Sequence, residues 1–248
     1  MAIITLTTDF GTRDGYVGAM KGVLARRAPG VQLVDLAHDV PRHDIAHGAW
    51  VLATAALEFP RGTIHLAVVD PGVGTARRGV IARASGQFFV GPDNGLFGYL
   101  DIERAWAIAA SRESSPTFHG RDVFAPAAAS LARGHDPDTW ALGQPVALVG
   151  QLPWGTRPAG EGRVIHVDHY GNLITDLPGE EAGEAVAIAG RRLPLARTYE
   201  DVAAGELLAY VGSMGTVEVA VREGRADGVL DAPRGTRIVP VAPGGEYR

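Results

Sequence analysis

The chain has 248 residues, 46% of them hydrophobic and 21% charged, with a formal net charge of −5, which is typical of a globular protein of one large or two modest domains and disfavours nucleic-acid binding. It contains no cysteine, which excludes disulfides, thiolate zinc sites and cysteine nucleophiles and fits a cytoplasmic protein. No apolar run approaches the roughly 20 residues of a membrane span, and the beginning MAIITLTTDF lacks signal-peptide features, so we expect no membrane contact.

The first 150 residues alternate between strand-like and helix-like segments. Short apolar runs predict strands over 3–7, 31–36, 63–69 and 105–109, and paired strands over 80–84 and 87–90 around Ser85-Gly86. Apolar spacing and capping signals predict helices over 14–27, from the cap Asp44 to Pro60, and from Asp122 to Arg133. Strands that alternate with helices favour an α/β domain with Rossmann-like layers and a largely parallel sheet.

The composition changes near residue 150. Residues 151–162 (QLPWGTRPAGEG) are rich in glycine and proline, so we interpret them as a linker between a domain over 1–150 and a domain over 163–248. In the second domain helical periodicity fades, and valines alternate with Glu218 and other residues in VEVAVR at 217–222. Frequent turns with glycine and proline complete the pattern of a small all-β domain, which we expect to be a barrel, with a sandwich as the alternative.

The stretch VVDPGVGTARRG at 68–79 follows an apolar strand and begins like a nucleotide-binding loop. Gly72 and Gly74 form a G-x-G turn, but Arg77 replaces the third glycine of a dinucleotide fingerprint, and no G-K-[ST] follows for a phosphate cradle. The turn instead places the carboxylate of Asp70 and the guanidinium of Arg77 seven residues apart.

Polar residues also follow other predicted strands. In open α/β sheets ligands bind beyond the carboxyl ends of the strands, which makes these turns candidate parts of a site. They are TTDFGTRD at 7–14, GPDNG at 91–95 and, in the second domain, HVDHYGN at 166–172. A further polar group, FHGRD at 118–122, precedes the predicted alanine-rich helix. Each group also has a structural interpretation: Asp9 and Asp122 as helix caps, Asp93-Asn94-Gly95 as a plain turn, and Arg77-Arg78 as a solvated pair.

Two further kinds of site are weaker alternatives. Histidines and acids crowd into residues 38–47 and 166–169, but no H-E-x-x-H or similar metal-ligand pattern is present. A Ser-His-Asp hydrolase would lack its G-x-S-x-G elbow. We therefore expect neither a metal ion nor a cofactor at the site.

Five segments, taken in order, resemble the S-adenosylmethionine (SAM) hydroxide adenosyltransferase family, the SAM hydrolases, which are related to the fluorinase and chlorinase. They are TTDFGTRD at 7–14, HLAVVDPGVGTARR at 65–78, GPDNGL at 91–96, TFHGRDVFAPAAA at 117–129 and VDHYGNLIT at 167–175. They extend over nearly the whole chain. The resemblance implies an α/β domain followed by a β-barrel, and a homotrimer with active sites between subunits.

The resemblance also implies roles for individual residues. The hydrolytic trio of the family corresponds to Asp70, Arg77 and His119, and the halogenases of the family lack the acid at the first of these positions. The substrate-binding residues that it implies are Asp9 for the ribose hydroxyls, Asp14 and Asp168 near the amino-acid end of methionine, Asn172 for adenine, Ser213 for the methionine carboxylate, and Tyr170. Met214 and Val221 stand where some relatives carry arginine.

The implied reaction is attack of water on C5′ of the ribose, which converts SAM to adenosine and methionine. The sulfonium departs as a neutral thioether, so neither a general acid nor a metal is needed. A guanidinium is not deprotonated in proteins, so Arg77 can hold the water but cannot be the base. Asp70 and His119 can both orient the water and take its proton. Gly72 and Gly74 are expected to let the backbone approach the nucleoside.

Other functions fit parts of the pattern. A protein that senses SAM or a nucleoside would need Asp9, Asn172 and the aromatic residues but not the hydrolytic trio, so we rank it second. A halogenase ranks third, because the carboxylate of Asp70 would repel an incoming anion. A metal-dependent hydrolase would require the ligand pattern that the sequence lacks.

Overall fold

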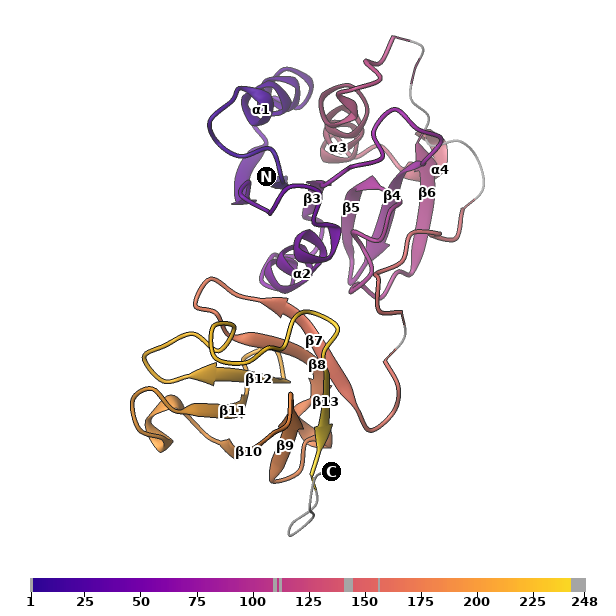
Figure 1. The fold of residues 1–248 in the computed structure, drawn as a ribbon. Coiled ribbons are helices and arrows are strands. Elements are labelled where there is room, and N and C mark those ends of the chain that lie inside the picture. Colours follow the sequence, from indigo (N-terminus) through magenta and orange to yellow (C-terminus); the bar gives the residue numbers. More distant parts are fainter. Residues whose placement is uncertain (1, 109–110, 112, 141–144, 156, 242–248) are drawn as a thin grey trace. The chain divides into compact units, whose positions relative to one another are not determined.

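The structure of the protein, a computed structural model, describes residues 2–108, 111, 113–140, 145–155 and 157–241 (Figure 1). The chain divides into two compact units, Met1–Pro153 and Trp154–Arg248, and each unit has hydrophobic cores of its own. The limits expected for the two domains and for the linker at 151–162 stay predictions. No helix in the described ranges is long and apolar enough to cross a membrane.

A six-stranded sheet forms the centre of the first unit, in the order β2-β1-β3-β5-β4-β6. Its strands are β1 (Ile3–Thr8), β2 (Gln32–Ala37), β3 (Ile64–Val68), β4 (Gly79–Ala84), β5 (Gln87–Pro92) and β6 (Arg104–Ile108). The first four in this spatial order are parallel, whereas β4 runs antiparallel to both β5 and β6. The sheet is therefore mixed, which corrects the prediction of a largely parallel sheet.

The antiparallel strand follows from the turn between β4 and β5. Ser85 and Gly86 join these strands with φ angles of 50° and 74°, the left-handed conformation of a two-residue hairpin turn. A parallel neighbour would need a crossover of about a dozen residues or more, and this connection is too short to supply one. The predicted pairing of the two strands is confirmed, and this hairpin is what makes the sheet mixed.

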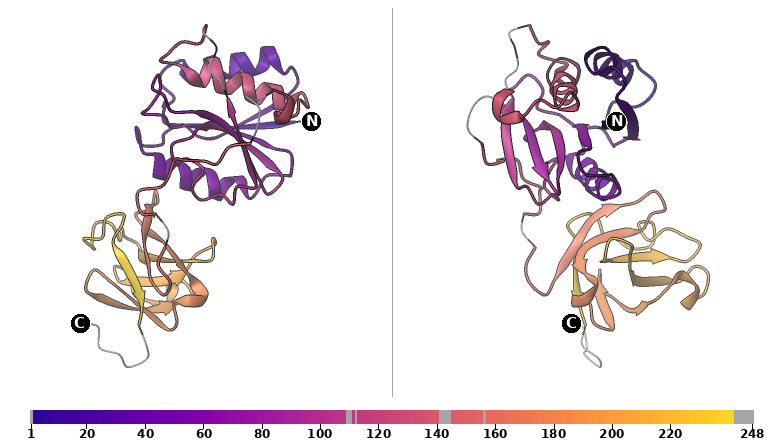
Figure 2. Two further views of the ribbon diagram at one scale, coloured as in Figure 1. Left: turned by 90° about the vertical axis from the view of Figure 1, so that its right-hand side faces the viewer. Right: turned by 180° about the vertical axis from the view of Figure 1, so that it is seen from behind.

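Helices cover both faces of this sheet (Figure 2). They are α1 (Tyr16–Arg27), α2 (Ile45–Ala56), α3 (Ala125–Ala132) and the short α4 (Pro137–Trp140). Helices α1 and α3 pack on one face and α2 packs on the other. Met20 and Leu24 of α1 are fully buried, as the apolar spacing predicted. Asp44 caps α2 by accepting a hydrogen bond from the amide nitrogen of His47 at 3.0 Å, which confirms the predicted cap.

The third predicted helix begins differently from the expectation. Gly120–Phe124 form a π-helical turn that leads into α3, and Asp122 lies inside this turn instead of capping the helix. Pro126 stands in the first turn of α3 and has no N–H to donate to the preceding residues, which accounts for the wider turn before it. Asp122 accepts a hydrogen bond from the amide nitrogen of Ser115 at 2.9 Å, so it closes the loop that carries His119.

The second unit contains a closed seven-stranded barrel, in the order β10-β11-β12-β8-β7-β13-β9, which confirms the predicted all-β barrel. Its strands are β7 (Gly162–Val167), β8 (Leu173–Pro178), β9 (Ala185–Ile188), β10 (Arg191–Ala196), β11 (Leu207–Val211), β12 (Thr216–Val221) and β13 (Arg237–Pro240). Val217 and Val219 of β12 belong to the barrel core, as the alternation predicted. Glu218 between them is also buried, which the alternation alone did not predict.

We predict opposite effects of two glycine-to-alanine substitutions in the first unit. In Gly91→Ala the new Cβ would lie 2.2 Å from the carbonyl oxygen of Ala67 on β3, so neighbouring strands would have to move apart. We expect the free energy of unfolding to fall by about 2–3 kcal/mol. Gly22→Ala, in open space on α1, should raise it by about 0.5–1 kcal/mol. Urea denaturation measures both values, and equal effects would contradict the packing argument.

Candidate active site

A carboxylate and a guanidinium meet beyond the end of β3. Asp70 lies just after this strand, and Arg77 lies just before β4. Nε of Arg77 donates to Oδ1 of Asp70 at 2.9 Å and to Oδ2 at 3.0 Å, and Nη2 donates to Oδ2. The Asp70 side chain is 4% exposed and that of Arg77 is 11% exposed. The two residues thus form a buried ion pair, and the interpretation of Arg77 as part of a solvated pair is wrong.

Close packing holds the turn between these two residues. Gly74 has a φ of 78°, and a Cβ at this position would lie 2.7 Å from the carbonyl oxygen of Pro116. This contact lets the turn pack directly on the loop that leads to His119. A Cβ at Gly72 would lie 3.3 Å from Cγ of Arg77. The two glycines therefore make room for another loop of the chain and for the Arg77 side chain.

His119 completes the cluster. Nη2 of Arg77 lies 3.0 Å from Nδ1 of His119, and the guanidinium carbon lies 5.1 Å from the centre of the Phe124 ring. Phe124 ends the π-helical turn, and Gly79 makes room for its ring, since a Cβ there would lie 2.8 Å from a ring carbon. The structure therefore brings together all three residues of the predicted hydrolytic trio.

The contact with Arg77 determines which ring nitrogen of His119 carries the proton. A guanidinium can only donate, so Nδ1 must accept, and the proton of the neutral imidazole belongs on Nε2. Burial and the positive charge of Arg77 lower the pKa of His119 below its ordinary value of 6.5, against smaller opposing effects of Asp70 and Asp122. At neutral pH His119 is therefore uncharged.

The turn after β5 supports the cluster without joining it. Asn94 donates from Nδ2 to the carbonyl oxygen of Val69 at 2.9 Å, which fixes the backbone at the start of the Asp70 turn. The side chain of Asp93 is 1% exposed and accepts a hydrogen bond from Nη2 of Arg78 at 2.6 Å. It also accepts from the backbone amides of residues 149–150. The contacts of this turn are thus structural.

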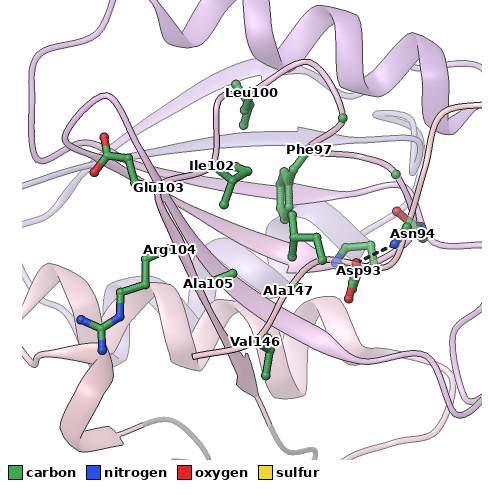
Figure 3. Close-up of a pocket in the computed structure, with 15 residues that line it drawn as sticks. Asp93, Asn94, Phe97, Leu100, Ile102, Glu103, Arg104, Ala105, Val146 and Ala147 are labelled. Carbon is green, nitrogen blue, oxygen red and sulfur yellow. Dashed lines mark hydrogen bonds between the residues drawn. The ribbon is translucent and has the colours of Figure 1, made fainter. Parts of the chain in front are cut away.

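A cavity of about 460 Å³ lies in the first unit (Figure 3). Its walls include Phe97, Leu100, Ile102 and Val146, together with the Asp93 carboxylate that Arg78 neutralises. None of the hydrolytic trio is among the described residues that line it. The cavity is therefore separate from the cluster of Asp70, Arg77 and His119.

Two predicted substrate-binding residues lie between β1 and α1. Asp9 accepts a hydrogen bond from the amide nitrogen of His43 at 2.8 Å. Asp14 is exposed. Gly15 is the N-terminal cap of α1, so the interpretation of Asp9 as a helix cap is wrong.

Three aromatic rings connect this segment to the loop of His119. Phe10, Tyr16 and Phe118 pack edge to face, with ring centres between 5.5 and 6.0 Å apart. Tyr16 is nevertheless 52% exposed. The aromatic cluster therefore places an accessible ring beside two of the predicted functional turns.

In the second unit, Asp168 and Asn172 lie on the connection between β7 and β8. The backbone amide of Asn172 donates to Oδ1 of Asp168 at 2.8 Å, and its side-chain Nδ2 donates to Oδ2 at 2.9 Å. Tyr170 of the same connection is 72% exposed, and Ser213 is exposed in the turn between β11 and β12. The structure thus pairs the two predicted residues Asp168 and Asn172, whereas no hydrogen bond within the described part joins Tyr170 or Ser213 to them.

Three residues beside Asn172 were not predicted from the sequence to belong with it. Nδ2 of Asn172 also donates to the hydroxyl of Tyr199 at 3.3 Å, and this hydroxyl lies 2.6 Å from that of Tyr210. Tyr210 in turn donates to Oε2 of Glu218 at 2.5 Å. The one signal in the sequence was the acid between the core valines of β12. No local motif marks the two tyrosines.

In the first histidine-rich segment, His38 makes contacts within the protein. Over the ranges that the structure describes, no group of three or more His, Cys, Asp or Glu residues could hold a metal ion. Nδ1 of His38 lies 2.9 Å from the hydroxyl of Thr8, and its Nε2 lies 3.0 Å from Oδ1 of Asp35. That the reaction needs no metal stays a prediction.

Comparison with known proteins relates both units to one family. Residues 4–141 match the family model described as the SAM hydroxide adenosyltransferase N-terminal domain, and residues 162–239 match that of the C-terminal domain. An (R)-S-adenosyl-L-methionine hydrolase of Thermus thermophilus is 42% identical, covering 96% of this chain and 99% of that protein. A fluorinase of an Actinoplanes species is 28% identical over 88% of this chain and 90% of its own length. The crystal structure of an uncharacterized conserved protein from Thermotoga maritima superposes with a TM-score of 0.84 at 32% identity, covering 95% of this chain and 98% of that one.

The charges around His119 make its pKa a direct test of the cluster. We expect a pKa below 6.5 in the intact protein. Arg77→Gln should raise this pKa because it removes a positive charge, and Asp70→Asn should lower it further because it removes a negative one. NMR titration of the imidazole measures both shifts, with the exposed His169 as the internal control. Titration of His119 at the same pH in all three proteins would contradict the coupling.

Proposed function

The chain belongs to the SAM hydroxide adenosyltransferase family, and we propose that it hydrolyses S-adenosyl-L-methionine to adenosine and L-methionine through attack of water on C5′ of the ribose. The name of the Thermus relative supports this substrate. The observation that carries the mechanism is the buried cluster of Asp70, Arg77 and His119. A protein that only sensed SAM would have no use for such a cluster.

The reaction needs a positioned nucleophile but no acid. The C5′–S bond breaks with both electrons going to sulfur, so the sulfonium becomes the neutral thioether of methionine. The oxygen of water forms the new C5′–O bond and releases one proton, which leaves adenosine. Because no proton has to reach the leaving group, a cluster that holds and deprotonates water is sufficient.

Arg77 is suited to hold this water. Its Nε and Nη2 bind Asp70 and His119, which leaves Nη1 to donate to one lone pair of the water while the other attacks C5′. The one accepting nitrogen of His119, Nδ1, is occupied by Arg77, whereas the carboxylate of Asp70 has about four acceptor positions and keeps one beside its bonds to Arg77. We therefore assign the proton to Asp70 and the positioning of the guanidinium to His119. Water that has begun to bond to carbon is far more acidic than free water, so a carboxylate is a sufficient base.

The remaining family positions are assigned to substrate binding. Asp9 uses one oxygen for a backbone amide, and its other oxygen is assigned to the ribose hydroxyls. Asp14 and Asp168 are assigned to the amino-acid end, where a carboxylate complements the ammonium group of methionine. Ser213 is assigned to the methionine carboxylate. Asn172 is assigned to adenine, with the ring of Tyr170 nearby in sequence.

A halogenase is a specific alternative because one of the relatives is a fluorinase. In that reaction a halide ion takes the place of water. The carboxylate of Asp70 neutralises the guanidinium that would otherwise attract an anion, and it would repel a halide at the same place. We therefore propose water as the nucleophile.

Hydrolysis in water labelled with oxygen-18 tests both the reaction and the bond that forms. With EDTA present, we expect equimolar adenosine and methionine, with the label in the 5′-hydroxyl of adenosine and not in methionine. Asp70→Asn keeps the shape of the side chain but removes the base, and should lower kcat by about 10²–10⁴-fold. Chromatography and mass spectrometry measure products and label.

Three outcomes would replace the proposal. Binding of SAM without release of either product would identify a sensing protein. Activity that EDTA abolishes and zinc or manganese restores would identify a metal-dependent hydrolase. A 5′-halogenated nucleoside formed on addition of fluoride or chloride would identify a halogenase.

We further propose that the protein acts in the cytoplasm as a homotrimer with active sites between subunits, without a cofactor, nucleic acid or membrane partner. The hydrolytic trio belongs to the first unit, whereas Asp168 and Asn172 belong to the second. The ring of Tyr16, 52% exposed at the edge of the aromatic cluster, is a surface that a neighbouring subunit would cover. Both features support a site completed by a second copy of the chain.

Mixing two inactive variants tests the shared site. Asp70→Ala damages the first unit, and the double variant Asp168→Ala/Asn172→Ala damages the second. Random mixing in a closed ring pairs an intact first unit with an intact second unit at about a quarter of the interfaces, so about a quarter of the activity should return. If native mass spectrometry confirms mixed trimers and their activity is no higher than that of the two inactive variants, each site is built from a single chain.

A further inference from the structure

A chain of side-chain hydrogen bonds runs from Asn172 to the buried Glu218. It crosses neighbouring elements of the barrel: Asn172 precedes β8, Tyr199 lies in a short turn before β11, Tyr210 lies on β11, and Glu218 lies opposite it on β12. The successive distances are 3.3, 2.6 and 2.5 Å. We call these four residues the Asn172–Glu218 chain.

Chemistry gives this chain one direction. The hydroxyl of Tyr210 donates to Oε2 of Glu218. Burial raises the pKa of both groups, and Tyr210, whose ordinary value is 10, keeps its proton. Its oxygen must then accept from the hydroxyl of Tyr199. The oxygen of Tyr199, having donated its own proton, is left to accept from Nδ2 of Asn172.

Asn172 therefore has a fixed orientation. One proton of Nδ2 goes to the Asp168 carboxylate, which can only accept, and the other goes to Tyr199. Both donors of the carboxamide are used, so only Oδ1 remains for a ligand. A rotated amide would place Oδ1 against the carboxylate of Asp168 and would break two hydrogen bonds at once.

The barrel is built to hold Glu218 in this place. Its neighbours in sequence are core valines, so alternation places Glu218 on the other face of the strand, yet its exposed fraction is only 9%. A Cβ at Gly212 would lie 1.9 Å from Oε1 of Glu218, so the glycine before Ser213 is the space that the carboxylate occupies. Burying a carboxylate costs free energy, even with a tyrosine as its hydrogen-bond donor. This cost indicates that the position of Glu218 has a role.

We propose that Glu218, acting through Tyr210 and Tyr199, is a positioning residue that makes Asn172 a pure acceptor and thereby selects nucleosides with a 6-amino group. The amino group is the only N–H donor on the base of adenosine, so it is the group that Oδ1 can read. A 6-oxopurine has a carbonyl oxygen in place of the amino group, so two acceptors would face each other and repel. This inference rests on the assignment of Asn172 to adenine in the proposed function.

Calorimetry with adenosine, inosine and 7-deazaadenosine tests the selection on the full-length protein. The wild type should bind adenosine and 7-deazaadenosine equally tightly, because both N–H donors of Asn172 are used within the protein and none is left for ring nitrogen 7. It should bind inosine about 100-fold more weakly. Tyr210→Phe breaks the chain and should reduce the adenosine-to-inosine ratio about 10-fold. Glu218→Gln keeps an acceptor for Tyr210 and should preserve most of the ratio.

A matched control separates selection from stability. Thr175 is buried in the same barrel and donates to the carbonyl oxygen of Val217 at 2.6 Å, outside the Asn172–Glu218 chain. Thr175→Val should lower the free energy of unfolding without changing the nucleoside ratio. If Tyr210→Phe does not fold, Tyr199→Phe removes the same connection at a side chain that is 39% exposed.

The outcomes distinguish this inference from the proposed function. Wild-type protein that binds inosine as tightly as adenosine, or binds no nucleoside, overturns the inference, and so does a tyrosine variant that keeps the wild-type ratio. A loss of ratio in Thr175→Val equal to that in Tyr210→Phe also overturns it. Protein that rejects inosine but releases no adenosine from SAM supports the inference and overturns the proposed function.

Discussion

A guanidinium buried between a carboxylate, an imidazole and an aromatic ring is the interaction on which the site of the first unit depends. Arg77 is charged although only 11% of its side chain is exposed, and removing the partner of such a buried charge costs about 3–5 kcal/mol. Asp70 supplies the balancing charge and Phe124 the face of a ring. His119 must therefore bind as a neutral group, because a second cation beside Arg77 would lose the hydrogen bond at Nδ1. Its lowered pKa is a requirement of the arrangement.

The need to surround Arg77 with these partners explains several close contacts that have no chemical role of their own. Separate loops have to reach one guanidinium, and each is fixed by a close contact. Gly74 lies against the carbonyl oxygen of Pro116, and Gly79 admits the ring of Phe124. Asn94 holds the backbone just before the Asp70 turn. Each contact joins segments that are distant in sequence, so the precision of the cluster comes from the packing of loops onto the end of the sheet.

The sequence predicted those features that local patterns encode. The spacing of α1, the cap at Asp44 and the hairpin at Ser85-Gly86 each lie within about a dozen residues, and the family motifs pointed to the hydrolytic trio. Features that depend on distant partners were not predictable. The motif around Asp93 is the same whether its carboxylate binds a ligand or pairs with Arg78, and the structure shows the pair with Arg78. A period of two assigns a residue to one face of a strand, but the burial of Glu218 depends on the tyrosine of the neighbouring strand that satisfies it.

The two units treat polar groups differently, and the difference fits the proposed reaction. The first unit gathers full charges around Arg77, which is the place of the proposed attack by water. The second unit orients Asn172 between the carboxylate of Asp168 and two tyrosine hydroxyls that are anchored on the buried Glu218. In the proposed function this fixed geometry serves to recognise a base. The substrate brings its own charge to this site: the sulfonium is positive before hydrolysis, and the thioether is neutral afterwards. Under the proposed assignment of Asp168 to the amino-acid end, its carboxylate attracts SAM more strongly than methionine, so hydrolysis itself weakens binding and favours release of the products.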